Sequence, residues 1–458
     1  MKSCAVLLWA ALPALILAEH QSRAGLAAAV GKAKSAPLQV RHAGATQTKG
    51  SLSTSNAVVS IFKNIVGCGM LAIPAGMASS KGSGLVPAVL LTLIVCVVSA
   101  NTFASFGSSL DMTGTSTFEE VWAATIGPKS TWIVTFSVLA LGLGAVLAYG
   151  CILGDVFSSI VPSLSRTNAI VSVSVTTLLP LVLAKDLSAL AFSSILGFAA
   201  VLYTTAFMVL RYADGTYGAD GPFFNSLPFG AGVEQVSLGR ISPGTLILVN
   251  MLLTAYMAHM NGPRFYMELE ERTPENFKRI SYRAFGLSAM IYVFVLIAGY
   301  ATFGKKAQGV ILNNYSGEDP LAFVARIANG ISVITSFPLL FTSARDGALS
   351  VLKNTSIGRA AASSDTAWRL FSIGLLTLVS LAAIVTTDVG FVVSVQGSLL
   401  GAGLCFTIPA LIYMGALKKT GRGNENMVAW KLLAGSGIAL AVFGTIITCL
   451  ETFTDLLS

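Results

Sequence analysis

Two short runs of glycine and proline interrupt apolar stretches of the chain, and each could bring backbone polar groups within reach of a ligand. The first run spans residues 64–74, with glycines at Gly67 and Gly69. The second spans residues 259–263 and reads HMNGP. A helix that breaks inside a bilayer leaves N–H and C=O groups unpaired, which is tolerated only where protein or a polar cavity satisfies them. The two runs therefore predict a ligand site at membrane depth.

The first break offers hydrogen-bond donors for an anion. If the helix stops here, a second half-helix begins with the N–H groups of Gly67, Cys68, Gly69 and Met70. The positive end of its dipole suits a carboxylate. A side chain in place of either glycine would block the ligand. The alternative explanation for the two glycines is close packing of one helix against another.

The second break offers acceptors for a cation. Carbonyls freed between Tyr256 and His259 would accept from an ammonium group, and neighbouring side chains such as Asn261 would surround the rest of the ligand. Together the two breaks would bind a ligand that carries both an anionic and a cationic group. His259 is the only histidine after residue 42, so its ring could sense pH near the site. Equally, it could make a capping hydrogen bond across the break.

Lys63 is the least expected residue of the chain, because it stands directly before the first break among apolar and small polar residues. An ionisable residue at membrane depth is a functional hypothesis by default. Burial favours the neutral form of a lysine, so Lys63 could take up and release a proton. The alternative is a side chain that extends to the nearest membrane surface.

Other polar residues in the apolar runs have more than one interpretation. Tyr149 and Asn250 could line a cavity. Asp155 could face an aqueous vestibule or pair with a cation in a loop. Glu268 could pair with Arg264, four positions earlier on the same helix.

Membrane-spanning helices must position all these residues. Of the 458 residues, 54% are hydrophobic and only 11% are charged, whereas a soluble domain has about 25% charged residues. The mean hydropathy is +0.75. A bilayer is crossed by about 17 to 25 apolar residues. Eleven such runs are found, at 54–78, 85–107, 132–160, 167–184, 187–210, 243–262, 284–303, 320–344, 369–387, 390–415 and 429–450.

The sequence thus predicts an all-α polytopic membrane protein whose first and sixth helices are broken. Interrupted helices at matching positions of two halves are typical of secondary transporters built from inverted repeats. The net charge of +8 does not indicate a nucleic-acid partner, because twenty Lys and Arg residues fall in segments on one side of the spans and six on the other. By the positive-inside rule, the N-terminal tail faces the cytosol and the C-terminus faces away.

The first fifty residues read as a leader followed by a tail. Residues 1–18 combine an early lysine with an apolar stretch, as a signal peptide does. Residues 19–53 are basic, with Glu19 their only acid, which is typical of a transit peptide or a disordered tail. The membrane domain is expected at 54–450, with a short tail at 451–458. The membrane concerned, whether plasma, vacuolar, endomembrane or plastid, stays open.

Six segments in this order resemble the amino acid/auxin permease family, within the amino acid–polyamine–organocation superfamily. They are GCGML at 67–71 with Pro74, KDLSAL at 185–190 with SSILG at 193–197, His259 with YMEL at 266–269, GYATFG at 299–304, SFPLL at 336–340 and PALIY at 409–413. The resemblance implies a LeuT-type fold of five plus five inverted helices with an eleventh appended. It also implies amino acid transport driven by protons or sodium, as in sodium-coupled neutral amino acid transporters.

The resemblance also bears on the coupling ion. Sodium-coupled members use an asparagine on the first helix and hydroxyl residues on the eighth, which would be Thr335 and Ser336 here. Aligning the glycines places Lys63 at the asparagine position, with Asn64 one step on. An ammonium could replace the cation, which favours proton-coupled symport of small neutral amino acids through Lys63. Sodium coupling through Asn64, Thr335 and Ser336 is the alternative.

Other classes of membrane protein fit the sequence less well. An enzyme would need a metal-ligand cluster or a set of nucleophile, base and orienting acid, and the sequence suggests neither. A channel would need rings of carbonyls or charges, and an amino acid sensor would need a larger cytosolic surface than these short loops provide. The expected partners are an amino acid, a coupling proton or sodium ion, and the lipid bilayer, without a cofactor; no protein partner is indicated.

Overall fold

The computed structural model describes residues 50, 52–79, 82–161, 163–184, 193–228, 237–422 and 427–453. The predicted leader at 1–18, the tail at 19–49 and the segment 185–190 lie outside the described residues. The helices are α2 (Thr54–Ile65), α3 (Ile73–Ala78), α4 (Leu85–Thr113), α5 (Phe118–Thr125), α6 (Trp132–Ile160), α7 (Arg166–Val173), α8 (Leu179–Leu183), α9 (Ser193–Ala213), α10 (Thr245–Ala255), α11 (Gly262–Glu268), α12 (Pro274–Phe303), α13 (Pro320–Leu352), α14 (Ser356–Ser363), α15 (Asp365–Val385), α16 (Val389–Gln396), α17 (Ile408–Lys419) and α18 (Met427–Phe453).

The predicted all-α membrane class is confirmed. Nine of the described helical segments are long and apolar enough to cross a bilayer. A tenth span results if the two helical pieces 54–65 and 69–78, bent by 46° at residues 66–68, are taken together. The predicted span 243–262 corresponds to α10, the 3-10 turn His259–Asn261 and the start of α11. The count of eleven spans stays a prediction.

Helix ends differ from the predicted spans where polar residues continue a helix beyond the apolar run. Helix α12 begins at Pro274 rather than at 284. The hydroxyl oxygen of Thr273 accepts from the N–H of Asn276 and caps its first turn. Hydropathy alone cannot reveal such an extension, because capping residues and the charged first turns are polar. At the other end of the chain, α18 runs to Phe453, past the predicted limit of 450.

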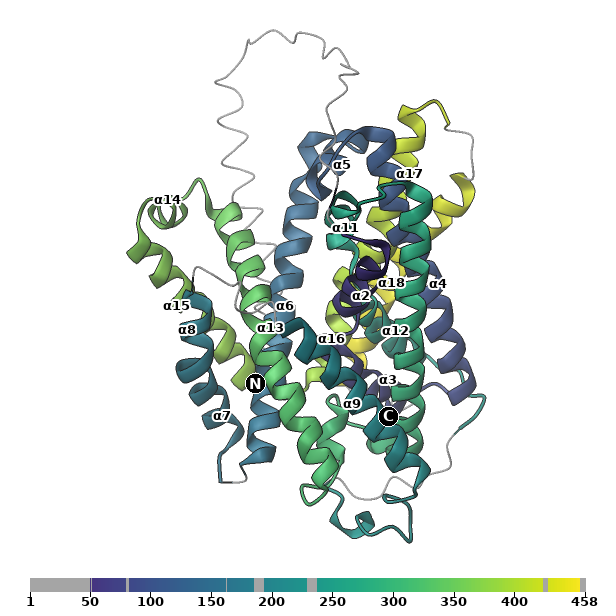
Figure 1. The fold of residues 1–458 in the computed structure, drawn as a ribbon, viewed down its shortest axis with the longest axis vertical. Helices are drawn as coiled ribbons and strands as arrows, with labels where there is room; N and C mark the ends of the chain where they lie inside the picture. Colours follow the sequence, from purple (N-terminus) through teal and green to yellow (C-terminus); the bar gives the residue numbers. More distant parts are fainter. Residues whose placement is uncertain are drawn as a thin grey trace.

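The two interrupted spans lie in the middle of the bundle. Figure 1 shows α2, α3 and α16 at the centre, with α7, α8, α13 and α15 on one side and α4 and α12 on the other. Helices α5, α11 and α14 lie at the upper end of the view. The arrangement surrounds the breaks with protein on both sides.

Small residues let the spans approach each other closely. A Cβ atom added at Gly107 of α4 would lie 2.8 Å from the ring of Phe277 on α12. A Cβ atom at Gly397 would collide with the carbonyl oxygen of Asn250 on α10. Gly397 opens the first of two π-helical turns, Gly397–Gly401 and Gly403–Thr407, that separate α16 from α17. These widened turns pack directly on the half-helix that precedes the second break.

Backbone hydrogen bonds join the start of the first interrupted span to the end of the sixth. The N–H of Leu52, just before α2, donates to the carbonyl of Glu268 over 2.9 Å, and its carbonyl accepts from the N–H of Glu270 over 3.1 Å. A Cβ atom at Gly50 would collide with the carbonyl oxygen of Glu268, so only glycine fits at this approach. The start of the first span is thereby fixed to the end of the sixth.

A buried polar cluster attaches α18 to the bundle. The side-chain amide nitrogen of Asn250 on α10 lies 3.1 Å from both the carbonyl oxygen of Gly444 and the hydroxyl of Thr448. The hydroxyl of Ser394 on α16 lies 2.8 Å from that of Thr448. A Cβ atom at Gly444 would collide with the amide oxygen of Asn250. Asn250 therefore joins helices instead of lining an open cavity.

We expect Gly444→Ala to lower the free energy of unfolding by about 1–3 kcal/mol, because the added methyl group overpacks this cluster. Gly435→Ala on the same helix is the matched control, since a Cβ atom there meets nothing within 4 Å. The control should change stability by less than about 1 kcal/mol. Melting temperatures of the purified proteins in detergent measure both effects. Equal melting temperatures for the two variants would contradict the assigned role of Gly444.

Candidate functional site

The two helix breaks lie next to each other. Helices α2 and α10 stop at Ile65 and Ala255. A Cβ atom built on Gly69 would lie 3.9 Å from the Cα of Ala255. The side-chain amide of Asn261 donates to the side-chain oxygen of Asn64 over 3.3 Å. Predicted ligand residues from the first and sixth spans are thus brought together, although they are far apart in sequence.

A tyrosine on α12 connects the two helix ends. The hydroxyl oxygen of Tyr292 lies 2.9 Å from the carbonyl oxygen of Ile65 and 2.8 Å from that of Ala255. Carbonyls at the C-terminal end of a helix lack the donor of the next turn. Sequence reasoning missed Tyr292. The available signal was a hydroxyl inside the apolar run 284–303, which needs a partner when buried.

Neither glycine of the first break is required by packing or by backbone conformation. Gly67 is extended, with φ −122° and ψ −160°, which other residues also adopt. A Cβ atom there would lie 3.6 Å from the hydroxyl oxygen of Tyr149 on α6, an ordinary contact. Among the described residues outside its own turn, a Cβ at Gly69 would come within 4 Å of the Cα of Ala255 alone. Close helix packing therefore does not explain these two glycines.

The turn after the first break is tighter than an α-helix. Residues Cys68–Ala72 form a 3-10 turn that leads into α3. Within it the N–H of Met70 donates to the carbonyl of Gly67 over 3.3 Å, and the Met70 side chain is fully buried. The Cys68 side chain lies outside the described part of the chain. A carboxylate at this turn would therefore depend on the N–H groups of residues 67–69.

His259 is buried between helices and does not line an open space. Its Nε2 atom lies 2.9 Å from the hydroxyl of Thr102 and 3.2 Å from the carbonyl oxygen of Ser99, both on α4. The ring packs against Phe103 and Phe285, with centroids 5.7 and 6.2 Å away. These contacts join the second break to α4. They differ from the capping bond that the sequence suggested, which would cross the break itself.

The residues predicted to couple a cation fall into two separate groups. Lys63 is half-buried in the last turn of α2, and Asn64 beside it is exposed. On α13, the hydroxyl of Thr335 donates to carbonyls of its own helix over 2.9 and 3.1 Å. Among the described residues, no hydrogen bond joins Lys63 or Asn64 to Thr335 or Ser336. The assignment of these residues to a cation site stays a prediction.

Two carboxylates have the partners that the sequence suggested. Asp155 accepts from Nε of Arg166, the first residue of α7, over 2.6 Å. It also accepts from the amide of Asn313 over 3.2 Å. Glu268 pairs with Arg264 over 2.8 Å on the exposed face of α11. The expected pairing of Glu268 within its own helix is confirmed, and Asp155 pairs with a cation at a helix start.

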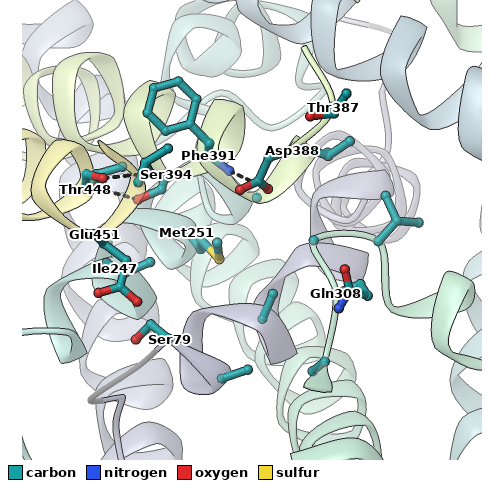
Figure 2. A pocket seen from close by; sticks show the side chains of 18 of the residues that line it. Ser79, Ile247, Met251, Gln308, Thr387, Asp388, Phe391, Ser394, Thr448 and Glu451 are labelled. Atoms are coloured by element: carbon teal, nitrogen blue, oxygen red, sulfur yellow. Dashed lines mark hydrogen bonds between the residues drawn. The ribbon is translucent and has the colours of Figure 1, made fainter. Parts of the chain in front are cut away.

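A cavity of about 390 Å³ opens on the side of α3. Its polar lining includes Asp155, Asp388, Glu451, Asn313, Gln308, Ser79, Thr387, Ser394, Thr448 and Thr452. Figure 2 shows Asp388 and Gln308 on one side of the cavity and Glu451 and Ser79 on the other. Of the residues weighed in the sequence, only Asp155 lines it. The sequence could not indicate this cavity, because its walls come from six separate segments.

We expect Gly67→Ala and Gly69→Ala to fold like the parent protein, because their added methyl groups meet only ordinary contacts. Gly397→Ala should destabilise the protein by about 1–3 kcal/mol or abolish folding, since its methyl group collides with a carbonyl oxygen. Size-exclusion profiles and melting temperatures in detergent distinguish the cases. A Gly67→Ala protein as unstable as Gly397→Ala would show that packing requires the first glycine after all.

Comparisons with known proteins agree with this geometry. A model of the family described as "Transmembrane amino acid transporter protein" matches residues 50–454. The putative sodium-coupled neutral amino acid transporter 11 of Danio rerio is 25% identical over 413 residues, covering 88% of this chain and 87% of that relative. The amino acid transporter AVT6E of Arabidopsis thaliana is 23% identical over 436 residues, covering 87% of this chain and 84% of that relative. The vacuolar amino acid transporter 7 of Saccharomyces cerevisiae is 26% identical over 294 residues, covering 63% and 57%.

Solved structures share the fold. The inward-facing conformation of Mhp1 superposes with a TM-score of 0.55 at 12% identity, covering 92% of this chain and 93% of that one. A sodium-coupled sialic acid symporter in a substrate-bound outward-open state gives a TM-score of 0.51 at 15% identity, covering 88% and 89%. Both are transporters with the LeuT-type fold. Membrane transport, and not an enzymatic reaction, is what this family performs. The chain is thus a multi-pass integral membrane protein with a LeuT-type fold, and it belongs to the transmembrane amino acid transporter protein family.

Proposed function

We propose that this protein is a secondary active transporter that moves small neutral amino acids by alternating access, with a proton as the coupling ion. The observation that carries the proposal is the adjacency of the two helix breaks, which places Gly69 beside Ala255. Broken helices at the centre of a transporter bundle supply donors and acceptors to a substrate without any charged side chain. That suits a zwitterion whose net charge is zero.

The substrate is proposed to lie across the two breaks. Its carboxylate would accept from the N–H groups of residues 67–69, and its ammonium would donate to carbonyls near Tyr256. The side chain of Asn261 and the hydroxyl of Tyr149, which is close to Gly67, would border it. The atoms that a Cβ at Gly67 or Gly69 would meet are a tyrosine hydroxyl and a backbone Cα, which supports a neutral substrate.

Lys63 is proposed to carry the coupling proton. It belongs to the last turn of α2, directly before the break, and it is half-buried. Among the described residues it has no ion pair. A proton carrier must be able to reach its neutral form, which burial of an ammonium group favours. Proton release into the opposite compartment would then accompany the opening of the site.

Sodium coupling is the second candidate. Two of the comparisons favour it, because the Danio rerio relative is named as sodium-coupled and the sialic acid symporter is described as sodium-coupled. The oxygens of Asn64, Thr335 and Ser336 would then form the cation site. In the structure the Thr335 hydroxyl donates to carbonyls of its own helix, which leaves its oxygen lone pairs able to bind a cation.

Uptake of radiolabelled amino acids into proteoliposomes, with proton and sodium gradients imposed separately, tests the coupling ion. We expect uptake to follow the proton gradient and to fall at least tenfold, roughly the effect of losing a required proton carrier, in Lys63→Ala. Lys63→Arg is the matched control for charge, since arginine keeps the positive charge but does not release its proton. It should also lose proton-driven uptake. Sodium-driven uptake that is indifferent to Lys63 would instead support the site at Asn64, Thr335 and Ser336.

Gly67→Ala tests the location of the substrate. The methyl group would occupy ligand space, so the KM for uptake should rise by about tenfold or more, in line with a misfit of one carbon in a binding pocket. The melting temperature should stay unchanged. Parent-like KM values in a stable variant would place the substrate elsewhere in the bundle.

A further inference from the structure

The hydroxyl group of Tyr292 is shared by two helix ends. The carbonyl oxygens of Ile65 and Ala255 both lie within 2.9 Å of the same phenolic oxygen. A phenol has one proton to donate, and a carbonyl can only accept. The hydroxyl therefore bonds one carbonyl at a time, and a small rotation of the O–H bond transfers the hydrogen bond from one break to the other.

We propose that Tyr292 is a positioning residue that couples the two helix breaks, so that the first and sixth spans change their geometry together. The proposal rests on the proposed function, in which the breaks hold the substrate. Tyr292 itself need not touch the substrate. Its role is to set the separation and orientation of the two backbone segments that contact the substrate.

The surroundings of Tyr292 make this link strong. Its side chain is fully buried, and its ring packs edge-on against Tyr256, with centroids 4.9 Å apart. In a buried site without competing water, a hydrogen bond holds its groups more firmly than at an exposed one. The other side-chain bond between the breaks, from Asn261 to Asn64, is exposed and longer, at 3.3 Å.

Further bonds tie the same helices together away from the breaks. The Sγ of Cys96 on α4 lies 3.3 Å from the carbonyl oxygen of Phe285 on α12. His259 reaches α4 through Thr102, and Leu52 pairs with Glu268 at the far ends of the interrupted spans. Helix α12 is thus anchored to its neighbours, and Tyr292 extends that anchor into the centre of the site.

Tyr292→Phe removes only the hydroxyl, because the ring and its packing against Tyr256 are kept. Tyr282→Phe is the matched control on the same helix. The Tyr282 residue is 38% exposed, and its hydroxyl lies 3.5 Å from the side-chain oxygen of Asn101. Hydrogen–deuterium exchange on the purified full-length protein reads out the backbone N–H groups of residues 67–70 and 256–261. We expect exchange to rise about five- to tenfold at both breaks in Tyr292→Phe, the effect of losing about one hydrogen bond. Exchange in α13 should stay as in the parent.

Acceleration at one break only would overturn the coupling, as would parent-like exchange at both. A uniform rise across α4, α12 and α13 would mean that the substitution destabilises the whole fold, which also overturns it. Tyr282→Phe should exchange like the parent throughout. These readouts do not depend on transport, so they decide on Tyr292 even if no amino acid proves to be a substrate.

Uptake kinetics test the link to substrate binding. With both breaks loosened, the substrate must order them on binding, so the KM of Tyr292→Phe should rise about five- to tenfold while the maximal rate stays within about twofold. A parent-like KM combined with faster exchange at both breaks would overturn the positioning role. Absence of uptake by the parent protein itself would refute the proposed function, separately from the exchange result.

Discussion

A backbone carbonyl inside a bilayer cannot turn to water, and this constraint determines how the protein can interrupt two of its spans. Each interruption frees the last carbonyls of a half-helix, and the surrounding helices must supply donors. The Tyr292 hydroxyl lies within reach of the carbonyls of both Ile65 and Ala255 and donates to one of them at a time. One hydroxyl can serve both helix ends in turn because the ends converge, and they converge near Gly67 and Gly69, which carry no side chains. The position of the two breaks and the donor that serves their carbonyls thus depend on the same convergence of helices.

The contacts divide the bundle into parts with different roles. Helices α2, α4, α10 and α12 are connected near the breaks by side-chain to backbone bonds from Tyr292, His259 and Cys96. Helices α6, α7 and α15 are connected elsewhere: Arg166 binds Asp155 and also donates to the carbonyls of Ala383 and Thr386 at the end of α15. The cavity beside α3 lies between these parts, lined by both. A transporter that works by moving one group of helices against another needs such separately tied groups.

The sequence predicts those features that depend on local composition and leaves out those made by distant contacts. Apolar runs reveal membrane spans because a bilayer demands them of any helix, and Gly67, Gly69 and Pro263 mark the interruptions, with Pro263 in the first turn of α11. The Arg264–Glu268 pair is visible for the same reason, since both residues lie on one turn of helix. Tyr292 and Ile65 are separated by 227 positions, and no periodicity connects them. The contacts of His259 with α4 and the walls of the cavity are equally non-local.

The two π-helical turns after α16 have a consequence for how chain length can vary. A π-turn contains one more residue than the α-helical turn it replaces. Removing one residue within Gly397–Gly401 can restore a regular turn there and leave both flanking faces in register, whereas the same deletion in α13 would rotate everything beyond it by about 100°. Deletion of a single residue is thus absorbed at a point that packs against α10, and the helical faces on either side of it keep their register.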